Sequence, residues 1–207
     1  MTFNIGIFLF TEVEVLDFAG PYEVFTTATR VAAREAIALP PVFNVFAIAE
    51  NLDPVRARAG LKFVPDFLLD THPSLDVLII PGGVVTTEME KPQVENWIFN
   101  TAGSTAITAS VCTGAFLLAK AGVLTTQKVT THWEDQDDLK HMFPSLDVIN
   151  DVRWMDEGAI VTSAGISAGI DMSLHIVERL AGLSLAERTA RQMEFEWMRH
   201  GLIAAQH

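Results

Sequence analysis

Residues 105–124 read Thr-Ala-Ile-Thr-Ala-Ser-Val-Cys-Thr-Gly-Ala-Phe-Leu-Leu-Ala-Lys-Ala-Gly-Val-Leu. The first seven form a short apolar run rich in small and β-branched side chains, which is typical of a strand buried on both faces. From Gly114 the spacing becomes helical, and Gly122 stands where a helix would end. The sequence therefore predicts a sharp turn from strand to helix, with Cys112 at the changeover.

Cys112 is the only cysteine of the chain, and its position has the geometry of a nucleophile elbow with sulfur in place of oxygen. The amides that open the next helix favour a thiolate, so we expect a reactive thiol with a lowered pKa. The alternative is a buried core cysteine, which is what most lone intracellular cysteines are. The surrounding sequence favours the reactive interpretation.

Length and composition limit the class of protein. The chain has 207 residues, which suits one well-buried domain over 1–207, and a single cysteine excludes an internal disulfide. The first ten residues lack the basic flank of a signal peptide. No apolar run approaches the roughly 20 residues that span a membrane. We therefore expect a cytoplasmic protein that does not enter the membrane.

The charge balance argues against a nucleic-acid partner. The net charge is −12, and the 14 Lys and Arg residues are scattered along the chain. A DNA-binding domain needs clustered basic side chains to neutralise phosphates. The acidity itself indicates only that the protein is soluble.

The rest of the chain alternates expected strands with expected helices. Strands are predicted at residues 4–10, 43–49, 76–80, 105–111, 128–131, 145–150, 152–155 and 159–163. Helices are predicted at residues 22–36, 93–102, 114–121, 134–142, 170–181 and 185–199. The strands are continuous apolar runs, and such runs between helices predict an α/β fold: a doubly wound, mostly parallel sheet with helices on both faces.

Three local signals refine this prediction. Pro21 suits the first turn of a helix, and a small hairpin is expected to turn near Gly60. Ser184, with Glu187 three residues later, has the capping-box pattern and predicts the start of the last helix.

Four loops should meet at the carboxyl ends of the strands, where function gathers in such a sheet. They carry Asp17, Gly82 with Gly83, Cys112 with Thr113, and Gly165 with Ile166. Asp17 could cap the following helix, or it could be a general acid/base whose pKa is raised by a negative sulfur nearby. The two glycines at 82 and 83 could form a simple turn or supply the amides of an anion hole.

His132 follows the strand predicted at 128–131, which could run beside the elbow. In a Cys-His arrangement this histidine would act as the base. Trp133 and the apolar context suit a structural histidine as well, so both interpretations stay open.

Five segments of the chain resemble the ThiJ/PfpI superfamily, which has the class I glutamine-amidotransferase-like fold. They are Leu16-Asp17-Phe18-Ala19-Gly20-Pro21, Ile80-Pro81-Gly82-Gly83, Ser110-Val111-Cys112-Thr113-Gly114, Thr130-Thr131-His132-Trp133 and Ala168-Gly169-Ile170-Asp171. The likeness runs over essentially the whole chain, and it is greatest to the isonitrile hydratases. Very similar segments occur in the amidotransferase-like domain of AraC-type transcription regulators.

The resemblance implies a hydratase that adds water to isonitriles and gives N-substituted formamides, without a metal or an organic cofactor. It implies that Cys112 forms a thioimidate and that Asp17 is the general acid/base. The residues that would bind the sulfur and the small-molecule substrate are Gly82, Gly83, Thr113, His132, Gly165 and Ile166. Members of the superfamily commonly dimerise, so a homodimer is expected.

Two rival functions remain. One is a non-catalytic regulator that senses a metabolite or an oxidant at Cys112, although the chain ends at His207 without room for the helix-turn-helix domain of AraC-type regulators. The other is a glyoxalase-like hydratase of α-oxoaldehydes. Against it, Thr113 stands where the peptidase-like and glyoxalase-like members carry His. Asp17 replaces the Glu of many members, as it does in the isonitrile hydratases. An amidotransferase subunit is disfavoured because no His-x-Glu pair is apparent.

Overall fold

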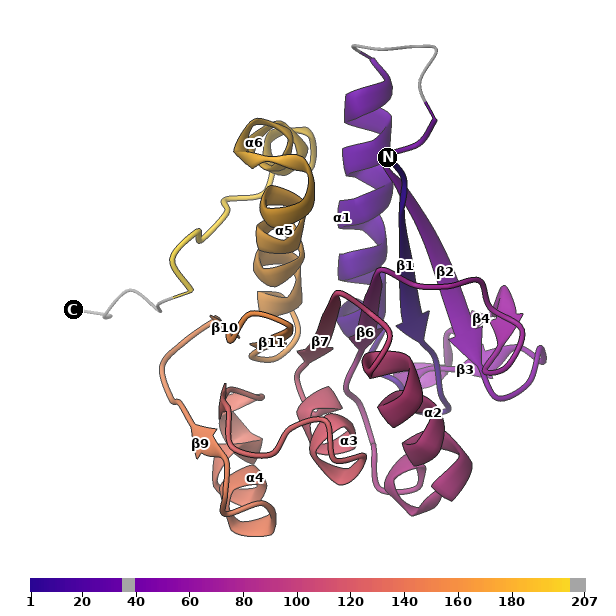
Figure 1. Ribbon diagram of the computed structural model, residues 1–207, viewed down its shortest axis with the longest axis vertical. Coiled ribbons are helices and arrows are strands. Elements are labelled where there is room, and N and C mark those ends of the chain that lie inside the picture. The colour runs from indigo at the N-terminus through magenta and orange to yellow at the C-terminus, as the bar shows by residue number, and fades with distance from the viewer. Residues whose placement is uncertain (35–39, 202–207) are drawn as a thin grey trace.

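The structure is a computed structural model that describes residues 1–34 and 40–201, and its centre is a seven-stranded sheet (Figure 1). The strand order is β10-β11-β7-β6-β1-β2-β5. The strands are β1 Phe3–Phe8, β2 Phe43–Ala49, β5 Phe67–Leu68, β6 Val77–Ile80, β7 Ile107–Val111, β10 Trp154–Asp156 and β11 Ile160–Ser163. All neighbours pair in parallel except β10, which is antiparallel to β11. The predicted α/β architecture is therefore confirmed.

Helices cover both faces of this sheet. On one face, α1 (Val15–Ala33), α5 (Ala168–Ala181) and α6 (Leu183–Gln192) pack against one another; on the other lie α2 (Pro92–Ala102) and α3 (Gly114–Lys120). Smaller elements complete the fold. They are α4 (Gln136–Met142), the 3-10 turns η1 (Arg58–Gly60), η2 (Glu88–Glu90) and η3 (Trp133–Asp135), the predicted hairpin of β3 (Val55–Arg56) and β4 (Lys62–Phe63), and a pair of β8 (Lys128–Val129) with β9 (Asp147–Val148).

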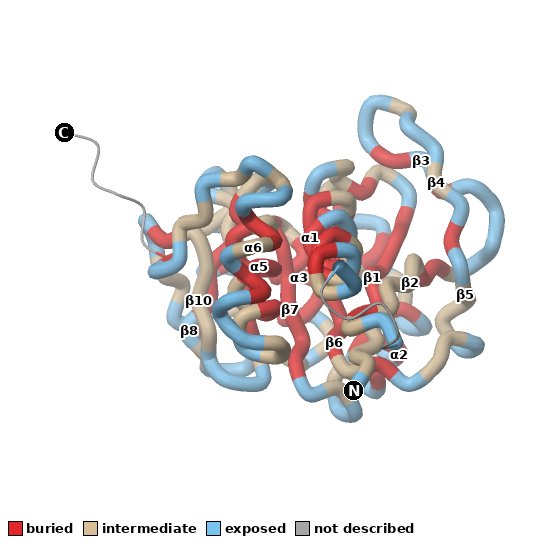
Figure 2. The backbone as a smooth tube through the Cα atoms, turned by 90° about the horizontal axis from the view of Figure 1, so that it is seen from above, coloured by how far each residue is buried: buried red, intermediate tan, exposed pale blue. Residues whose placement is uncertain are grey.

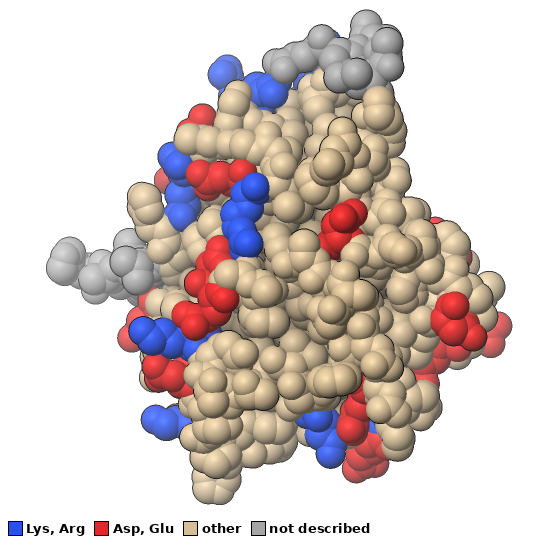
Figure 3. Space-filling model, in the orientation of Figure 1, with Lys and Arg blue, Asp and Glu red and all other residues tan. Residues whose placement is uncertain are grey.

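The core lies between the sheet and its two helix layers (Figure 2). All residues of β6 and β7 are buried, which explains why these strands are continuous apolar or small-residue runs. Each fully buried side chain such as Ile79 or Phe25 contributes roughly 1.5–3 kcal/mol through removal from water. On the face in Figure 3, Lys and Arg side chains stand beside Asp and Glu and form no continuous basic surface among the residues drawn in colour.

The start of α1 differs from the prediction. The helix begins at Val15, and its N-cap is Glu14, whose carboxylate accepts a hydrogen bond of 3.1 Å from the Val15 amide. Asp17 therefore lies inside the first turn, and its interpretation as an N-cap is wrong. Pro21 lies inside the helix rather than in its first turn, and its missing N–H leaves the carbonyl of Asp17 without the usual helical donor. The predicted end at residue 36 lies outside the described residues.

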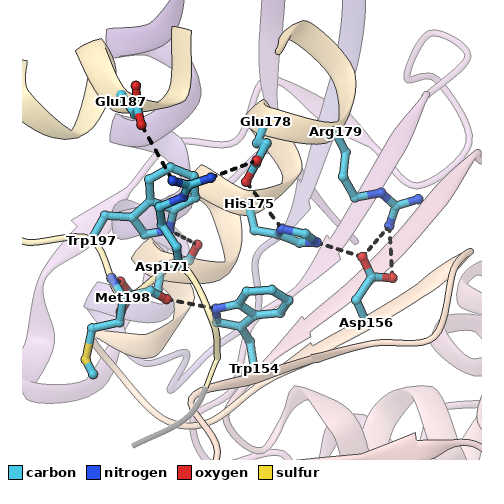
Figure 4. A network of polar contacts seen from close by, with 10 residues as sticks. Trp154, Asp156, Asp171, His175, Glu178, Arg179, Glu187, Trp197 and Met198 are labelled. Carbon is cyan, nitrogen blue, oxygen red and sulfur yellow. Dashed lines mark hydrogen bonds and ion pairs between the residues drawn. The ribbon is translucent and has the colours of Figure 1, made fainter. Parts of the chain in front are cut away.

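The last predicted helix is also shorter than expected. α6 ends at Gln192, and its N-cap is Gly182, with no side-chain cap from Ser184. Residues 193–201 form an irregular segment, here called the C-terminal strap, which is fastened to α5 and β10 (Figure 4). The Met198 amide donates to Asp171 Oδ1 at 2.7 Å, and Trp154 Nε1 donates to the Met198 carbonyl at 3.3 Å. These partners replace the helical hydrogen bonds that the sequence pattern predicted.

Candidate active site

The four predicted loops meet at the carboxyl edge of the sheet, below β6 and β7 in Figure 1. Asp17 bonds to the loop after β6 and to the loop after β11, and the loop after β6 bonds to Thr113 at the start of α3. Residues that are up to 149 positions apart in sequence are therefore within hydrogen-bond reach of one another.

Cys112 occupies the expected turn between β7 and α3. Its φ is 57°, a left-handed conformation that a residue with a side chain adopts only at an energetic cost. The surrounding backbone holds it there: its amide donates to Ser163 O at 3.1 Å, and its carbonyl accepts from Thr131 Oγ1 at 2.7 Å. The residue is only 8% exposed, so the surrounding fold covers most of it.

Asp17 is completely buried beside this sulfur. Its Oδ2 accepts from the Gly82 amide at 3.2 Å, its Oδ1 accepts from the Ile166 amide at 3.1 Å, and its carboxyl is hydrogen-bonded to Cys112. Within residues 1–34 and 40–201, no Lys, Arg or His forms an ion pair with it. Burial, which outweighs these hydrogen bonds, raises the pKa of Asp17 to about 7.

The pKa of the Cys112 thiol is raised, which contradicts the prediction of a lowered value. Burial is the largest cause, the charge of Asp17 is the next, and the hydrogen bond from the Thr113 amide opposes them without prevailing. The amide of Thr113, the N-cap residue of α3, therefore stabilises the thiolate less than desolvation destabilises it. Asp17 and Cys112 titrate as a pair, and a thiolate forms most easily when Asp17 takes the proton.

The two glycines after β6 have different partners. A Cβ on Gly82 would lie 2.6 Å from Thr113 N and 2.9 Å from Asp17 Oδ2, so only glycine lets these groups approach. The Gly83 amide donates to Thr113 Oγ1 at 2.9 Å, and this hydroxyl donates to Gly83 O, also at 2.9 Å. Both amides are thus engaged within the protein, and their role as an anion hole for substrate stays a prediction.

His132 and Gly165 lie next to each other at the rim of the site. A Cβ on Gly165 would overlap the imidazole, so the ring packs directly on the glycine backbone. His132 Nδ1 lies 3.4 Å from Asp135 Oδ2 and accepts from the Glu134 amide at 3.4 Å. In the described part of the chain, the hydrogen-bond partners of the Cys112 side chain are Asp17 and the Thr113 amide, and His132 is not among them. This arrangement favours the structural interpretation of the histidine.

Three groups near Cys112 were not predicted. Thr131 and Ser163 fix the Cys112 backbone, and the charge of Asp135 contributes to the raised pKa of the thiol. The pKa of Asp135 is itself raised, mainly by burial. Thr131 lies in the segment Thr130-Thr131-His132-Trp133 that resembles the ThiJ/PfpI superfamily, but nothing in the sequence places Asp135 near the sulfur.

Cys112 has a strained backbone at a strand-to-helix turn and lies beside a buried carboxyl group, which is the backbone geometry of a nucleophile elbow in an α/β fold. A sequence model of the DJ-1/PfpI family matches residues 4–179. The chain belongs to this family. In the described ranges no three His, Cys, Asp or Glu side chains are grouped so that they could hold a metal ion. None of the helices in those ranges has the length and apolar character needed to cross a bilayer.

Several known proteins are similar to the chain. Isonitrile hydratase from Pseudomonas putida is 34% identical over 197 residues, which cover 94% of this chain and 79% of that protein. The HTH-type transcriptional regulator GbdR from Pseudomonas aeruginosa is 25% identical over 197 residues, and the match covers 95% of this chain and 52% of the regulator. Among solved structures, a ThiJ/PfpI family protein from Pseudomonas syringae has a TM-score of 0.83 and 26% identity, covering 95% of this chain and 76% of that one.

Proposed function

We propose that the chain is a hydratase that adds water to isonitriles, R–N≡C, and releases N-substituted formamides without a cofactor. Cys112 is the nucleophile, and Asp17 is the general acid/base. The observation that carries the proposal is the hydrogen bond between Asp17 and the single cysteine, in a site where the carboxyl is buried and its pKa is about 7. A group with that pKa can both accept and return a proton near neutral pH.

In the first step the sulfur attacks the electrophilic carbon of the isonitrile. Asp17 takes the thiol proton as the S–C bond forms and then passes this proton to the same carbon, which gives the thioimidate R–N=CH–S–Cys112. Because the raised pKa of the thiol leaves it mostly protonated, the carboxylate is needed to remove this proton during attack. The amides of Gly82 and Ile166 hold the two oxygens of Asp17 in position for both transfers.

In the second step water adds to the thioimidate carbon. One water proton goes to the nitrogen and the other goes to the departing sulfur, and Asp17 carries the proton between oxygen and sulfur. The C–S bond breaks, so the products are R–NH–CHO and the free thiol of Cys112. The enzyme returns to its initial protonation state, and no oxidant or reductant is consumed.

The test is a substrate panel of methyl isocyanide, cyclohexyl isocyanide and methylglyoxal with the full chain, read by NMR for formamides and lactate. We expect formamides and no lactate. The same preparation alkylated at its one cysteine serves as the control and should be inactive. Lactate alone would favour the glyoxalase-like hydratase, and formamide formation that survives alkylation would show that the nucleophile is assigned wrongly.

A second candidate function is a regulator module that binds a small molecule. Its support is the match to GbdR, of which this chain spans about half the length. The net charge of −12 and the mixed surface charges in Figure 3 disfavour direct DNA binding by these residues. We expect no retardation of promoter-sized DNA at moderate salt. Salt-sensitive retardation together with an inactive substrate panel would favour the regulator.

A cytoplasmic homodimer also belongs to this proposal. Light scattering on the purified chain should then give a mass near twice the 22.7 kDa of one copy. A mass that equals one copy at micromolar concentration would contradict the dimer and leave the chemistry of the site unaffected.

A further inference from the structure

A cleft of about 530 Å³ lies between the loop after β6 and α4, with α3 as its floor. This volume falls in the range of roughly 300–1,000 Å³ that is common for small-ligand sites. Its walls are mostly apolar and come from Val84, Val85, Met89, Phe116 and Met142. Val84 and Met142 are 44% and 51% exposed, whereas Val85 and Phe116 are buried beneath them. The cleft therefore has an apolar floor and two accessible apolar walls.

The inner end of this cleft reaches the candidate active site. Gly83 and Thr113 belong to its lining, and they are joined to each other by the two hydrogen bonds of the Thr113 hydroxyl. The Thr113 amide is hydrogen-bonded to the sulfur of Cys112. An electrophile bonded to this sulfur would therefore have its remaining atoms next to the inner end of the cleft.

The rim of the cleft on the side of α4 carries negative charge. Asp135 and Asp138 line the cleft on the side of α4, and the charge of Asp135 is close enough to affect the thiol of Cys112. An apolar substituent gains free energy when it leaves water for the walls, whereas a carboxylate on the same substituent would be repelled by the rim.

We propose that this cleft holds the substituent of the electrophile attacked by Cys112, and that it selects uncharged branched or cyclic hydrocarbon groups. This inference rests on the proposed function and deepens it, because the hydrocarbon group held in the cleft is then the N-substituent of the isonitrile. Val84 and Met142, on opposite walls, determine the size that is accepted. The apolar walls favour the hydrocarbon, and the two carboxylates at the rim exclude anionic groups.

A test that does not depend on turnover uses alkylation of the single cysteine. N-cyclohexyl-iodoacetamide and N-methyl-iodoacetamide each form an S–CH₂ bond, release iodide and pass the thiol proton to solvent. The ratio of their labelling rates at Cys112 measures how well the larger group is accommodated. Val84→Phe and Met142→Trp each narrow the cleft, so we expect each to lower the cyclohexyl/methyl ratio by about tenfold, as a small steric change in an apolar pocket does.

Val64→Phe is the matched control. Val64 is an exposed valine, 68% accessible, in a separate cleft that is lined by Phe18, Tyr22 and Phe63. The control should leave the labelling ratio within about twofold of the wild-type ratio. An unchanged ratio in both Val84→Phe and Met142→Trp would overturn the inference, as would an equal fall in Val64→Phe, which would assign the substituent to the other cleft.

The two proposals fail differently. If the wild type hydrates isocyanides but the kcat/KM ratio of cyclohexyl to methyl isocyanide is unaffected by narrowing the cleft, the proposed function stands and this inference fails. If no isocyanide is hydrated but both narrowing variants lower the labelling ratio, the hydratase proposal fails and the cleft still holds the substituent of another electrophile.

Discussion

Asp17 and Asp171 are both completely buried, and each lies in the first turn of its helix, α1 or α5. Their surroundings differ. Asp171 faces a cation: Arg153 Nε donates to its Oδ2 at 2.7 Å, and the Met198 amide donates to its Oδ1. Asp17 faces two backbone amides and the thiol of Cys112, and no cation in residues 1–34 and 40–201 pairs with it.

On the proposed function, this difference explains why Asp171 holds the fold together whereas Asp17 transfers protons. Burial raises the pKa of both residues, but Arg153 and the Met198 amide oppose the rise at Asp171 and tie that group to the fold. At Asp17 only neutral groups oppose the rise in pKa, so the carboxyl gains or loses its proton near neutral pH. Asp171 contributes to holding the C-terminal strap, whereas the raised pKa of Asp17 means that ionisation of this buried carboxyl lowers the free energy of unfolding as pH rises toward 7.

The largest effect is expected from removal of the sulfur. Cys112→Ala should lower kcat for isocyanide hydration by at least about 10³-fold, because without sulfur no thioimidate forms and water must attack alone. Alanine fits the space, so the thermal midpoint should stay close to that of the wild type. The loss in kcat is checked by measuring formamide production, with heat-denatured protein as the blank. A loss in kcat of less than tenfold would show that Cys112 is not part of the mechanism.

Asp17→Asn should cost about 10²- to 10⁴-fold in kcat, the range for removal of a general acid/base. The amide keeps the shape of the carboxyl but cannot accept the thiol proton. Asp171→Asn is the matched control, because it makes the same change at an equally buried position in another first turn. If both variants lost activity equally, the separation between the two carboxylates would be wrong.

The elbow was predictable from sequence because it depends on neighbours in the chain: an apolar run, Cys112, and helical spacing from Gly114. The start of α1 was not predictable, because it depends on a bridge between Val13 and Gly83 that joins distant segments. For the same reason the C-terminal strap was taken for helix: its partner Asp171 is 27 residues from Met198. The raised thiol pKa escaped prediction because burial, its main cause, is a property of the folded protein.

Asp171→Asn should destabilise the fold by about 3 kcal/mol, since Arg153 would be left partly buried without its counter-charge. Urea unfolding measures this loss. Folded protein should keep kcat within about threefold of the wild type, because Asp171 touches neither Cys112 nor the cleft beside it. A stable but inactive variant would contradict the structural role and would connect the strap to the chemistry.

The pH dependence of the hydration rate tests the same difference between Asp17 and Asp171. The carboxylate form of Asp17 is needed to accept the thiol proton, and the raised pKa of about 7 means that this form is lost as pH falls through 7. Hydration should therefore slow by about tenfold per pH unit below 7, or about 100-fold at pH 5. The inflection of the pH–rate profile near pH 7 should vanish in the Asp17→Asn variant and should stay in place in the Asp171→Asn variant. An inflection near pH 4 in the wild type would mean that burial does not control this group.

The smallest effect is expected at Arg199, which pairs with Glu178 and Glu187, two residues labelled in Figure 4. Arg199 lies 3.4 Å from Glu178 Oε1 and 3.6 Å from Glu187 Oε1, and its guanidinium stands 5.4 Å from the centroid of the Trp197 ring. Because its side chain is 39% exposed, solvent screens both ion pairs, and Arg199→Ala should cost less than about 1 kcal/mol. Urea unfolding at low salt and at 0.5 M salt should show this loss shrinking as the ions screen the charges. A salt-independent loss above about 2 kcal/mol would mean that the strap is held by the Arg199 side chain rather than by the buried carboxylate of Asp171.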